Sequence, residues 1–261
     1  NSKLNLEKYV TLSKITDAQM FAIMVSGLAS VAGTVLLAYA QMGAQLEYLL
    51  AACFMSAPGG LMMAKIIFPD DTQQVSLSDD LSMDSMESPH TNIIMAASVG
   101  ASDGVKLAVS IAAMLIAFVA LIALTNSLFV GLGSLIGIEG LTMQKILGWV
   151  FSPIMFLLNI PWDEAQAAGA LFGEKLILNE FVAFSHLNEY LSGMSEKTTV
   201  IVTFALCGFA NFASIGILMG SLGILMPEKK EFIARYGLKA VLAGSLANLM
   251  SAAFAGLLFV S

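Results

Sequence analysis

The stretch Cys-Gly-Phe-Ala-Asn-Phe-Ala-Ser-Ile-Gly (Cys207–Gly216) lies in the middle of an uncharged run over residues 198–227. A bilayer core about 30 Å thick needs about 20 helical residues at about 1.5 Å each, so the run is longer than one straight crossing requires. Gly, Asn and Ser at its centre are typical of a helix that is broken inside the membrane. The alternative is that these small residues only allow close helix packing.

A second stretch of the same kind, Gly-Leu-Ala-Ser-Val-Ala-Gly (Gly27–Gly33), interrupts another long uncharged run. When Thr16 is aligned with Ser195, the two interruptions coincide, and each unit continues into a further apolar run. We therefore expect two repeats, over residues 15–68 and 195–261, each with a broken helix followed by a span. This pairing is typical of a secondary transporter with its binding site at the breaks.

The composition supports a membrane protein. The chain of 261 residues is 57% hydrophobic and only 12% charged, with a mean hydropathy of +0.83, whereas soluble domains carry about 25% charged residues. Its apolar runs are continuous, and a transmembrane barrel would instead alternate apolar and polar residues. The net charge of −7 argues against nucleic-acid binding. We predict an all-α polytopic membrane protein, an inverted-repeat secondary transporter with a re-entrant hairpin and discontinuous transmembrane helices.

The segments between the two repeats are predicted not to be simple spans. Residues 92–103 are too short to cross the membrane and mildly amphipathic, which favours an interfacial helix. The stretch before them is acidic and rich in serine. We expect an acidic linker at 69–91, an interfacial helix and a long scaffold helix at 92–138, an interfacial helix at 139–162 and a re-entrant hairpin at 163–191.

The hairpin is predicted from Gly-Glu-Lys-Leu-Ile-Leu-Asn-Glu-Phe (Gly173–Phe181), which places three charges and an amide between apolar neighbours. Ionisable side chains at membrane depth point to function. The alternatives are that Glu180 and Lys175 only pair with each other, or that the segment is an interfacial loop. For His186 and Tyr190, on the same segment, we favour a structural or interfacial role.

Basic residues predict the orientation. The loop between the last two spans is basic and is expected in the cytoplasm, which places the C-terminus outside. Lysines before the first span place its start on the cytoplasmic side too, so that the first and third long runs cross in opposite directions. The basic residues are Lys229, Lys230, Arg235 and Lys239 in the loop and Lys3, Lys8 and Lys14 before the first span.

Three common enzyme motifs are absent from the sequence: it contains no G-x-x-x-x-G-K-[ST] loop, no H-E-x-x-H and no Cys-x-x-Cys. Its two histidines, His90 and His186, are far apart, so a metal enzyme is not expected. We predict a protein that is not an enzyme, has no organic cofactor and transports by using an ion gradient.

Four stretches together resemble the concentrative nucleoside transporters, and the similarity covers the chain from Ile15 onward. They occur in the same order as in that family, which makes the resemblance specific. The stretches are Ser26–Tyr39, Met55–Lys65, Gly173–Ala183 and Ala205–Gly216.

The resemblance implies a homotrimeric symporter of cations and nucleosides, multi-pass in the plasma membrane (the bacterial inner membrane), with a scaffold and a mobile transport domain. By position, Glu180, Asn211 and Ser214 would hydrogen-bond the ribose hydroxyls. Phe209 would line the pocket, and Val35 would lie by the nucleobase. A carboxylate and an amide are chemically able to bridge vicinal hydroxyls.

The same resemblance assigns a sodium site to Ser30 and Val31, through hydroxyl and carbonyl oxygens. A hard cation prefers such oxygen ligands. A proton is the alternative coupling ion. In the family, a first hairpin precedes the segment equivalent to Ile15, but residues 1–14 do not match it. We therefore expect the C-terminal part of a longer protein, and a non-transporting or incomplete membrane subunit of the same fold is the other alternative.

Overall fold

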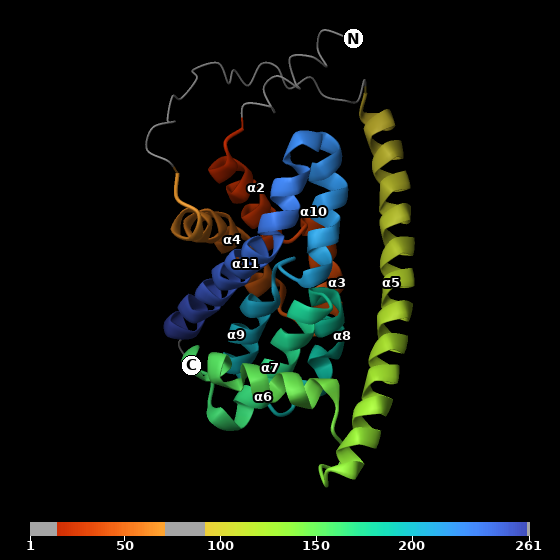
Figure 1. The fold of residues 1–261 in the computed structure, drawn as a ribbon, viewed down its shortest axis with the longest axis vertical. Helices are drawn as coiled ribbons and strands as arrows, with labels where there is room; N and C mark the ends of the chain where they lie inside the picture. Colours follow the sequence, from red (N-terminus) through yellow and green to blue (C-terminus); the bar gives the residue numbers. More distant parts are fainter. Residues whose placement is uncertain (1–14, 71–91, 260–261) are drawn as a thin grey trace.

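The computed structural model describes residues 15–70 and 92–259, and apart from one 3-10 turn their regular structure is α-helical (Figure 1). The predicted segment 1–14 with its lysines and nearly all of the predicted linker 69–91 lie outside the described residues. The elements are α2 (Asp17–Ala29), α3 (Gly33–Gln41), α4 (Leu46–Ile67), α5 (Ile93–Leu135), α6 (Met143–Leu157), α7 (Trp162–Ile177), α8 (Glu180–Leu191), α9 (Glu196–Leu206), α10 (Phe212–Leu225), η2 (Pro227–Lys229) and α11 (Lys230–Leu258).

Both predicted breaks are present. The first run is divided into α2 and α3 and the second into α9 and α10. Thr16 and Ser195 are the N-caps of the first halves, and each side chain accepts a hydrogen bond from a backbone N–H in the first turn. Ala32 and Asn211 are the N-caps of the second halves. The two units therefore begin and resume at equivalent positions of the alignment.

The two broken spans run in opposite directions and meet at their breaks. The Lys229 ammonium lies 2.7 Å from the Asp17 carboxylate, which brings the end of the second span to the start of the first. At the breaks, the Phe209 N–H donates to the Ser30 carbonyl at 3.2 Å. This arrangement is an inverted pair of discontinuous helices (Figure 1), as the sequence predicted.

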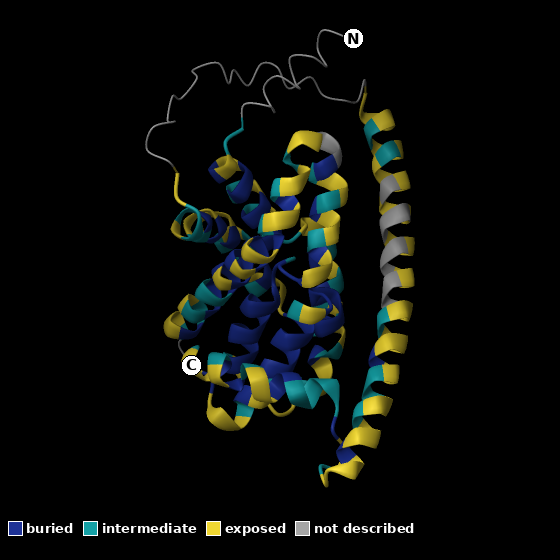
Figure 2. Ribbon diagram, in the orientation of Figure 1, coloured by how far each residue is buried: buried dark blue, intermediate teal, exposed yellow. Residues whose placement is uncertain are grey.

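The unbroken helices α4 and α11 pack around the point where the two helix breaks meet, which we call the crossing. α11 packs against α2, α4, α9 and α10. Gly244 on α11 lies so close to the crossing that an added Cβ would be 3.1 Å from the Cβ atoms of both Leu28 and Ala210. Figure 2 shows the buried residues concentrated where these helices meet α7 and α9.

The lengths and composition of the helices fit several membrane crossings, so the chain is an all-α, multi-pass membrane protein. Within the described residues, four segments are long and apolar enough to span: Asp17–Gln41, Leu46–Ile67, Ile116–Leu135 and Pro227–Leu258. The pair of α6 and α7 passes the same test only as one unit, bent by 117° at the break between them.

The structure differs from the expectation of a separate interfacial helix over 92–103. These residues form the first turns of α5, which continues from Ile93 to Leu135. The sequence from 92 to 135 contains no proline, so nothing removes a backbone donor and ends the helix. α5 lies along one side of the molecule (Figure 1) and leaves large apolar side chains such as Ile116 and Leu124 exposed.

Candidate functional site

Glu180 is the centre of a buried polar cluster at the tip of the hairpin. α7 ends before Leu178, and Asn179 caps α8 by accepting a hydrogen bond from the Val182 N–H. The carboxylate of Glu180 is therefore in the first turn of α8, where the positive end of the helix dipole favours an anion. Its Oε1 accepts from the Tyr39 hydroxyl at 3.1 Å, and its Oε2 accepts from Asn211 Nδ2 at 3.1 Å.

Asn211 and Ser214 extend this cluster along α10. Asn211 Oδ1 accepts from the Ser214 N–H and from the Ser214 hydroxyl, both at 2.9 Å. The Ser214 hydroxyl also contacts the carbonyl of Phe209 inside the break. The structure thus joins Glu180, Asn211, Ser214 and the backbone of Phe209 in one hydrogen-bonded network of a carboxylate, an amide and a hydroxyl.

Tyr39 was not predicted from the sequence, although it closes one of the stretches that carry the resemblance. Its ring is fully buried and stacks on Phe184 at a centroid distance of 4.3 Å. A buried tyrosine hydroxyl requires a partner, and this one finds Glu180. Val35 lies one helical turn before Tyr39 on α3, half-buried against the same core. Val35 packs against the core that contains Tyr39, and its apolar side chain cannot hydrogen-bond to the Glu180 cluster.

The predicted sodium residues lie at the first break. Ser30 is the C-cap of α2, and its hydroxyl contacts the Gly27 carbonyl at 3.4 Å. Its carbonyl accepts from the Phe209 N–H, so Ser30 is connected to the cluster. Val31 follows it and is half-buried. The break therefore offers hydroxyl and carbonyl oxygens, the ligand type that a hard cation prefers.

Lys175 does not pair with Glu180, which was the alternative for the hairpin charges. Its side chain is fully buried and its ammonium donates to Asn248 Oδ1 at 3.0 Å and to the Ala205 carbonyl at 3.3 Å. The helix break at residues 178–179 separates the two charged residues. The alternative of a direct Lys175–Glu180 ion pair is therefore not what the structure shows.

A second polar chain links the hairpin to α6 and α5. The buried Glu174 carboxylate accepts from Gln144 Nε2 at 2.8 Å and lies 3.0 Å from His186 Nδ1. Gln144 Oε1 accepts from Asn126 Nδ2 at 3.0 Å, and Asn126 Oδ1 accepts from the Met143 N–H at 2.8 Å. The half-buried His186 thus has a defined partner, and one chain of hydrogen bonds ties four helices together.

Replacing Gln144 by leucine is expected to lower the free energy of unfolding by about 2 kcal/mol, because Glu174 loses a buried donor. The measurement is the midpoint of thermal unfolding in detergent, which should fall by roughly 4–8 °C. Gln166→Leu, at an exposed position on α7, is the matched control and should change little. Equal midpoints for the two variants would contradict a stabilising role for the chain.

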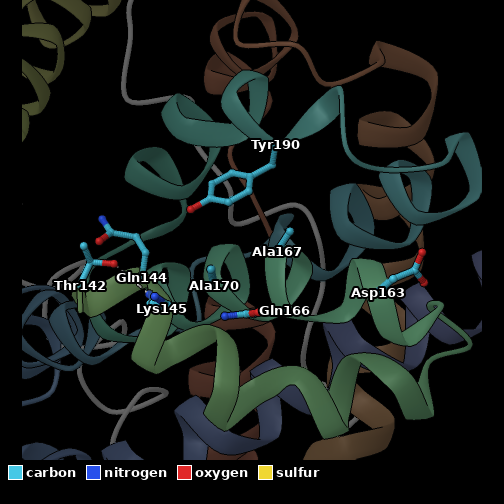
Figure 3. A pocket seen from close by; sticks show the side chains of 8 residues that line it. All are labelled: Thr142, Gln144, Lys145, Asp163, Gln166, Ala167, Ala170 and Tyr190. Carbon is cyan, nitrogen blue, oxygen red and sulfur yellow. Dashed lines mark hydrogen bonds between the residues drawn. The ribbon is translucent and has the colours of Figure 1, made fainter. Parts of the chain in front are cut away.

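A cavity of about 370 Å³ opens between α6, α7 and the end of α8 (Figure 3). Tyr190 lies on one side of it, and Lys145 and Gln166 lie on the other. No residue of the Glu180 cluster lines this cavity, so the cavity is not the site predicted from the sequence. Its lining residues are Thr142, Gln144, Lys145, Asp163, Gln166, Ala167, Ala170 and Tyr190.

Comparison with known proteins identifies relatives over almost the whole chain. Residues 48–256 match the family described as "Na+ dependent nucleoside transporter C-terminus". The uncharacterized transporter YutK of Bacillus subtilis is 51% identical over 246 residues, covering 94% of this chain and 61% of that protein. Nucleoside permease NupC of Helicobacter pylori is 49% identical over 251 residues, covering 94% of this chain and 59% of that protein.

A comparison with solved structures finds similar proteins with the same fold. The structure of CNTnw in an inward-facing substrate-bound state superposes with a TM-score of 0.86 at 47% identity, over 94% of this chain and 58% of that chain. The present chain spans about three fifths of the length of the curated relatives it matches.

Proposed function

The chain belongs to the concentrative nucleoside transporter family, and we propose that the whole protein takes up nucleosides in symport with a cation. The family consists of transporters, so catalysis is not part of the proposal. The observation that carries the proposal is the Glu180 cluster, in which a carboxylate from α8 meets an amide and a hydroxyl from α10 and the Tyr39 hydroxyl from α3 beside a helix break.

The cluster has the chemistry to hold a ribose. A carboxylate offers about four lone-pair positions, and Tyr39 and Asn211 use one on each oxygen of Glu180. The remaining positions can accept from two vicinal hydroxyls, while Asn211 and Ser214 supply further polar atoms. Phe209 is assigned to the wall of the pocket and Val35 to the nucleobase end. Tyr39 and Asn211 orient the carboxylate by donating to its two different oxygens, Oε1 and Oε2.

Sodium is the proposed coupling ion, held by oxygens of Ser30 and Val31. The connection of the Ser30 carbonyl to Phe209 supports this assignment, because it joins the ion position to the substrate cluster by one hydrogen bond. Binding of the ion would then favour the arrangement that binds ribose. A proton is the alternative coupling ion, and the experiment below separates the two.

The proposed mobile transport domain consists of the two repeats, 15–68 and 195–261, and the hairpin 163–191. Its support is the dense packing of α11 on α2, α4 and α9 and of α7 on α8 and α9. The segment 92–138 forms the proposed scaffold, because α5 is mostly exposed in this chain alone. The helix α6 in 139–162 packs along α7 and is therefore placed with the hairpin. The exposed apolar face of α5 is available to lipid and to the other protomers of the proposed homotrimer.

Nucleoside uptake by vesicles tests the function directly. The protein, expressed from its complete gene, is expected to accumulate labelled uridine or another nucleoside when an inward ion gradient is present. Sodium and pH are varied separately at fixed membrane potential, and the gradient that drives uptake identifies the ion. Absence of gradient-dependent accumulation of every nucleoside tested would sink the proposal and leave a non-transporting subunit of the same fold.

A further inference from the structure

Lys175 is a buried charge with an unusual set of partners. Its side chain is 0% exposed. Among the described residues, Lys175 has no carboxylate within 4.0 Å of its ammonium; the basic residues that form ion pairs are Lys65, His186 and Lys229. Within the same part of the chain, its ammonium hydrogen-bonds only to neutral oxygens, Asn248 Oδ1 and the Ala205 carbonyl, and lies 5.5 Å from the ring centroid of Phe172. The carboxylate of Glu180 interacts with it electrostatically from a longer distance. Burying an ammonium is costly unless its hydration is replaced, so these groups must act as a solvation shell.

One oxygen of this shell is at the end of a half-helix, and the other is on an α11 side chain that is bonded to the ends of two half-helices. Ala205 is in the last turn of α9, where carbonyls lack helical donors and carry partial negative charge. Asn248 on α11 donates from Nδ2 to the Ala29 carbonyl at 2.8 Å and to the Cys207 carbonyl at 3.0 Å. These bonds fix the amide so that its Oδ1 faces Lys175.

The Lys175 ammonium therefore lies where the C-terminal ends of α2 and α9 converge. Carbonyl and amide oxygens at the ends of broken helices are the ligands by which transporters of this architecture bind monovalent cations. An ammonium is a compact point charge on a flexible stem, so it satisfies the same oxygens without exchange with solvent. The Lys175 side chain extends from α7 of the hairpin. It connects the hairpin directly to the end of α9 and, through Asn248, to the end of α2.

We propose that the ammonium of Lys175 is a built-in cation that permanently occupies this oxygen cluster in place of a free monovalent ion. Removing the side chain opens a position that a small free cation can take. The position is distinct from the proposed sodium site at Ser30 and Val31. The inference extends the ion coupling of the proposed function, but its test needs no nucleoside and no transport, so the two can fail independently.

The test compares two variants of the protein expressed from its complete gene. Lys175→Ala removes the charge and leaves space, whereas Lys175→Met removes the charge and fills the space. Unfolding midpoints are measured in NaCl, LiCl and KCl, with N-methylglucamine chloride as the large cation, at equal ionic strength. Both variants should unfold at lower temperature than the unmodified protein in the large cation. Only for Lys175→Ala should a small cation raise the unfolding midpoint again, by about half of the loss, and this rise should saturate as the concentration of the small cation increases.

The control is Lys230→Ala, an exposed lysine at the start of α11, which should respond to cations like the unmodified protein. The proposal is overturned if Lys175→Ala and Lys175→Met show the same dependence on cations. It is also overturned if Lys175→Met is as stable as the unmodified protein. If Lys175→Ala aggregates on extraction in every salt, a free cation does not replace the ammonium, and the proposal is equally wrong.

Discussion

Replacement of Glu180 by glutamine is expected to reduce nucleoside uptake by about 100-fold or more while leaving the protein folded. Hydrogen bonds to a charged group contribute about 1.5–3 kcal/mol each, and about 1.4 kcal/mol corresponds to a factor of ten. Losing charge-assisted bonds to two ribose hydroxyls therefore accounts for a loss of this size. Glutamine also presents its NH2 group to one of the two donors, Tyr39 or Asn211, each of which now faces a carboxylate oxygen.

Two readouts separate a binding role from a structural one. Initial uptake rates at several uridine concentrations give the loss in transport, and the shift of the unfolding midpoint with uridine gives the loss in binding. Glu189→Gln is the matched control, because Glu189 is an exposed carboxylate on the same helix. If Glu180→Gln retains both uptake and the stabilisation by uridine, the cluster is not the ribose site.

Substitution of Gly208 by alanine is expected to destabilise the protein by about 3 kcal/mol, since overpacking a tight site costs about this much. An added Cβ would lie 2.2 Å from Asn248 Oδ1 and 2.7 Å from the Ala29 carbonyl oxygen. Neither atom is free to move away, because Asn248 is bonded to Lys175 and to Ala29. The clash falls at the crossing of the two breaks and cannot be relieved locally.

The unfolding midpoint of Gly208→Ala is therefore expected to fall by roughly 6–12 °C. Gly216→Ala is the control, because Gly216 lies in α10 of the same broken span and a Cβ there has no atom within 4 Å. That variant should be neutral or stabilised by up to about 1 kcal/mol, as alanine favours a helix. Equal stability of the two variants would show that the crossing is looser than the structure indicates.

Local properties of the sequence allowed much of the fold to be predicted. The length of the uncharged runs indicated membrane helices, and small or polar residues inside two of them indicated the breaks. The residue types that cap helices begin both broken spans and restart the second, at Thr16, Ser195 and Asn211. These features depend on near neighbours in the chain, so the sequence alone carries them.

The length of α5 shows where local patterns were insufficient. The short, mildly amphipathic stretch over 92–103 suggested a separate helix, but the structure has one helix from Ile93 to Leu135. A few polar side chains do not break hydrogen bonds of the backbone, and helix continuity depends on those bonds. A charged residue can mark the end of a membrane span while the helix itself continues past it. The surroundings of the helix decide where the helix ends.

The sequence by itself determined that the chain is a helical membrane protein, where its spans are interrupted and which hairpin carries charge. The tertiary structure alone decided the partners of those charges. The sequence left open whether Lys175 pairs with Glu180, but the helix ends between them, and their hydrogen-bond partners include Asn248 for Lys175 and Tyr39 for Glu180. A buried charge takes the polar groups that folding brings within about 3 Å, and these come from helices far away in the chain.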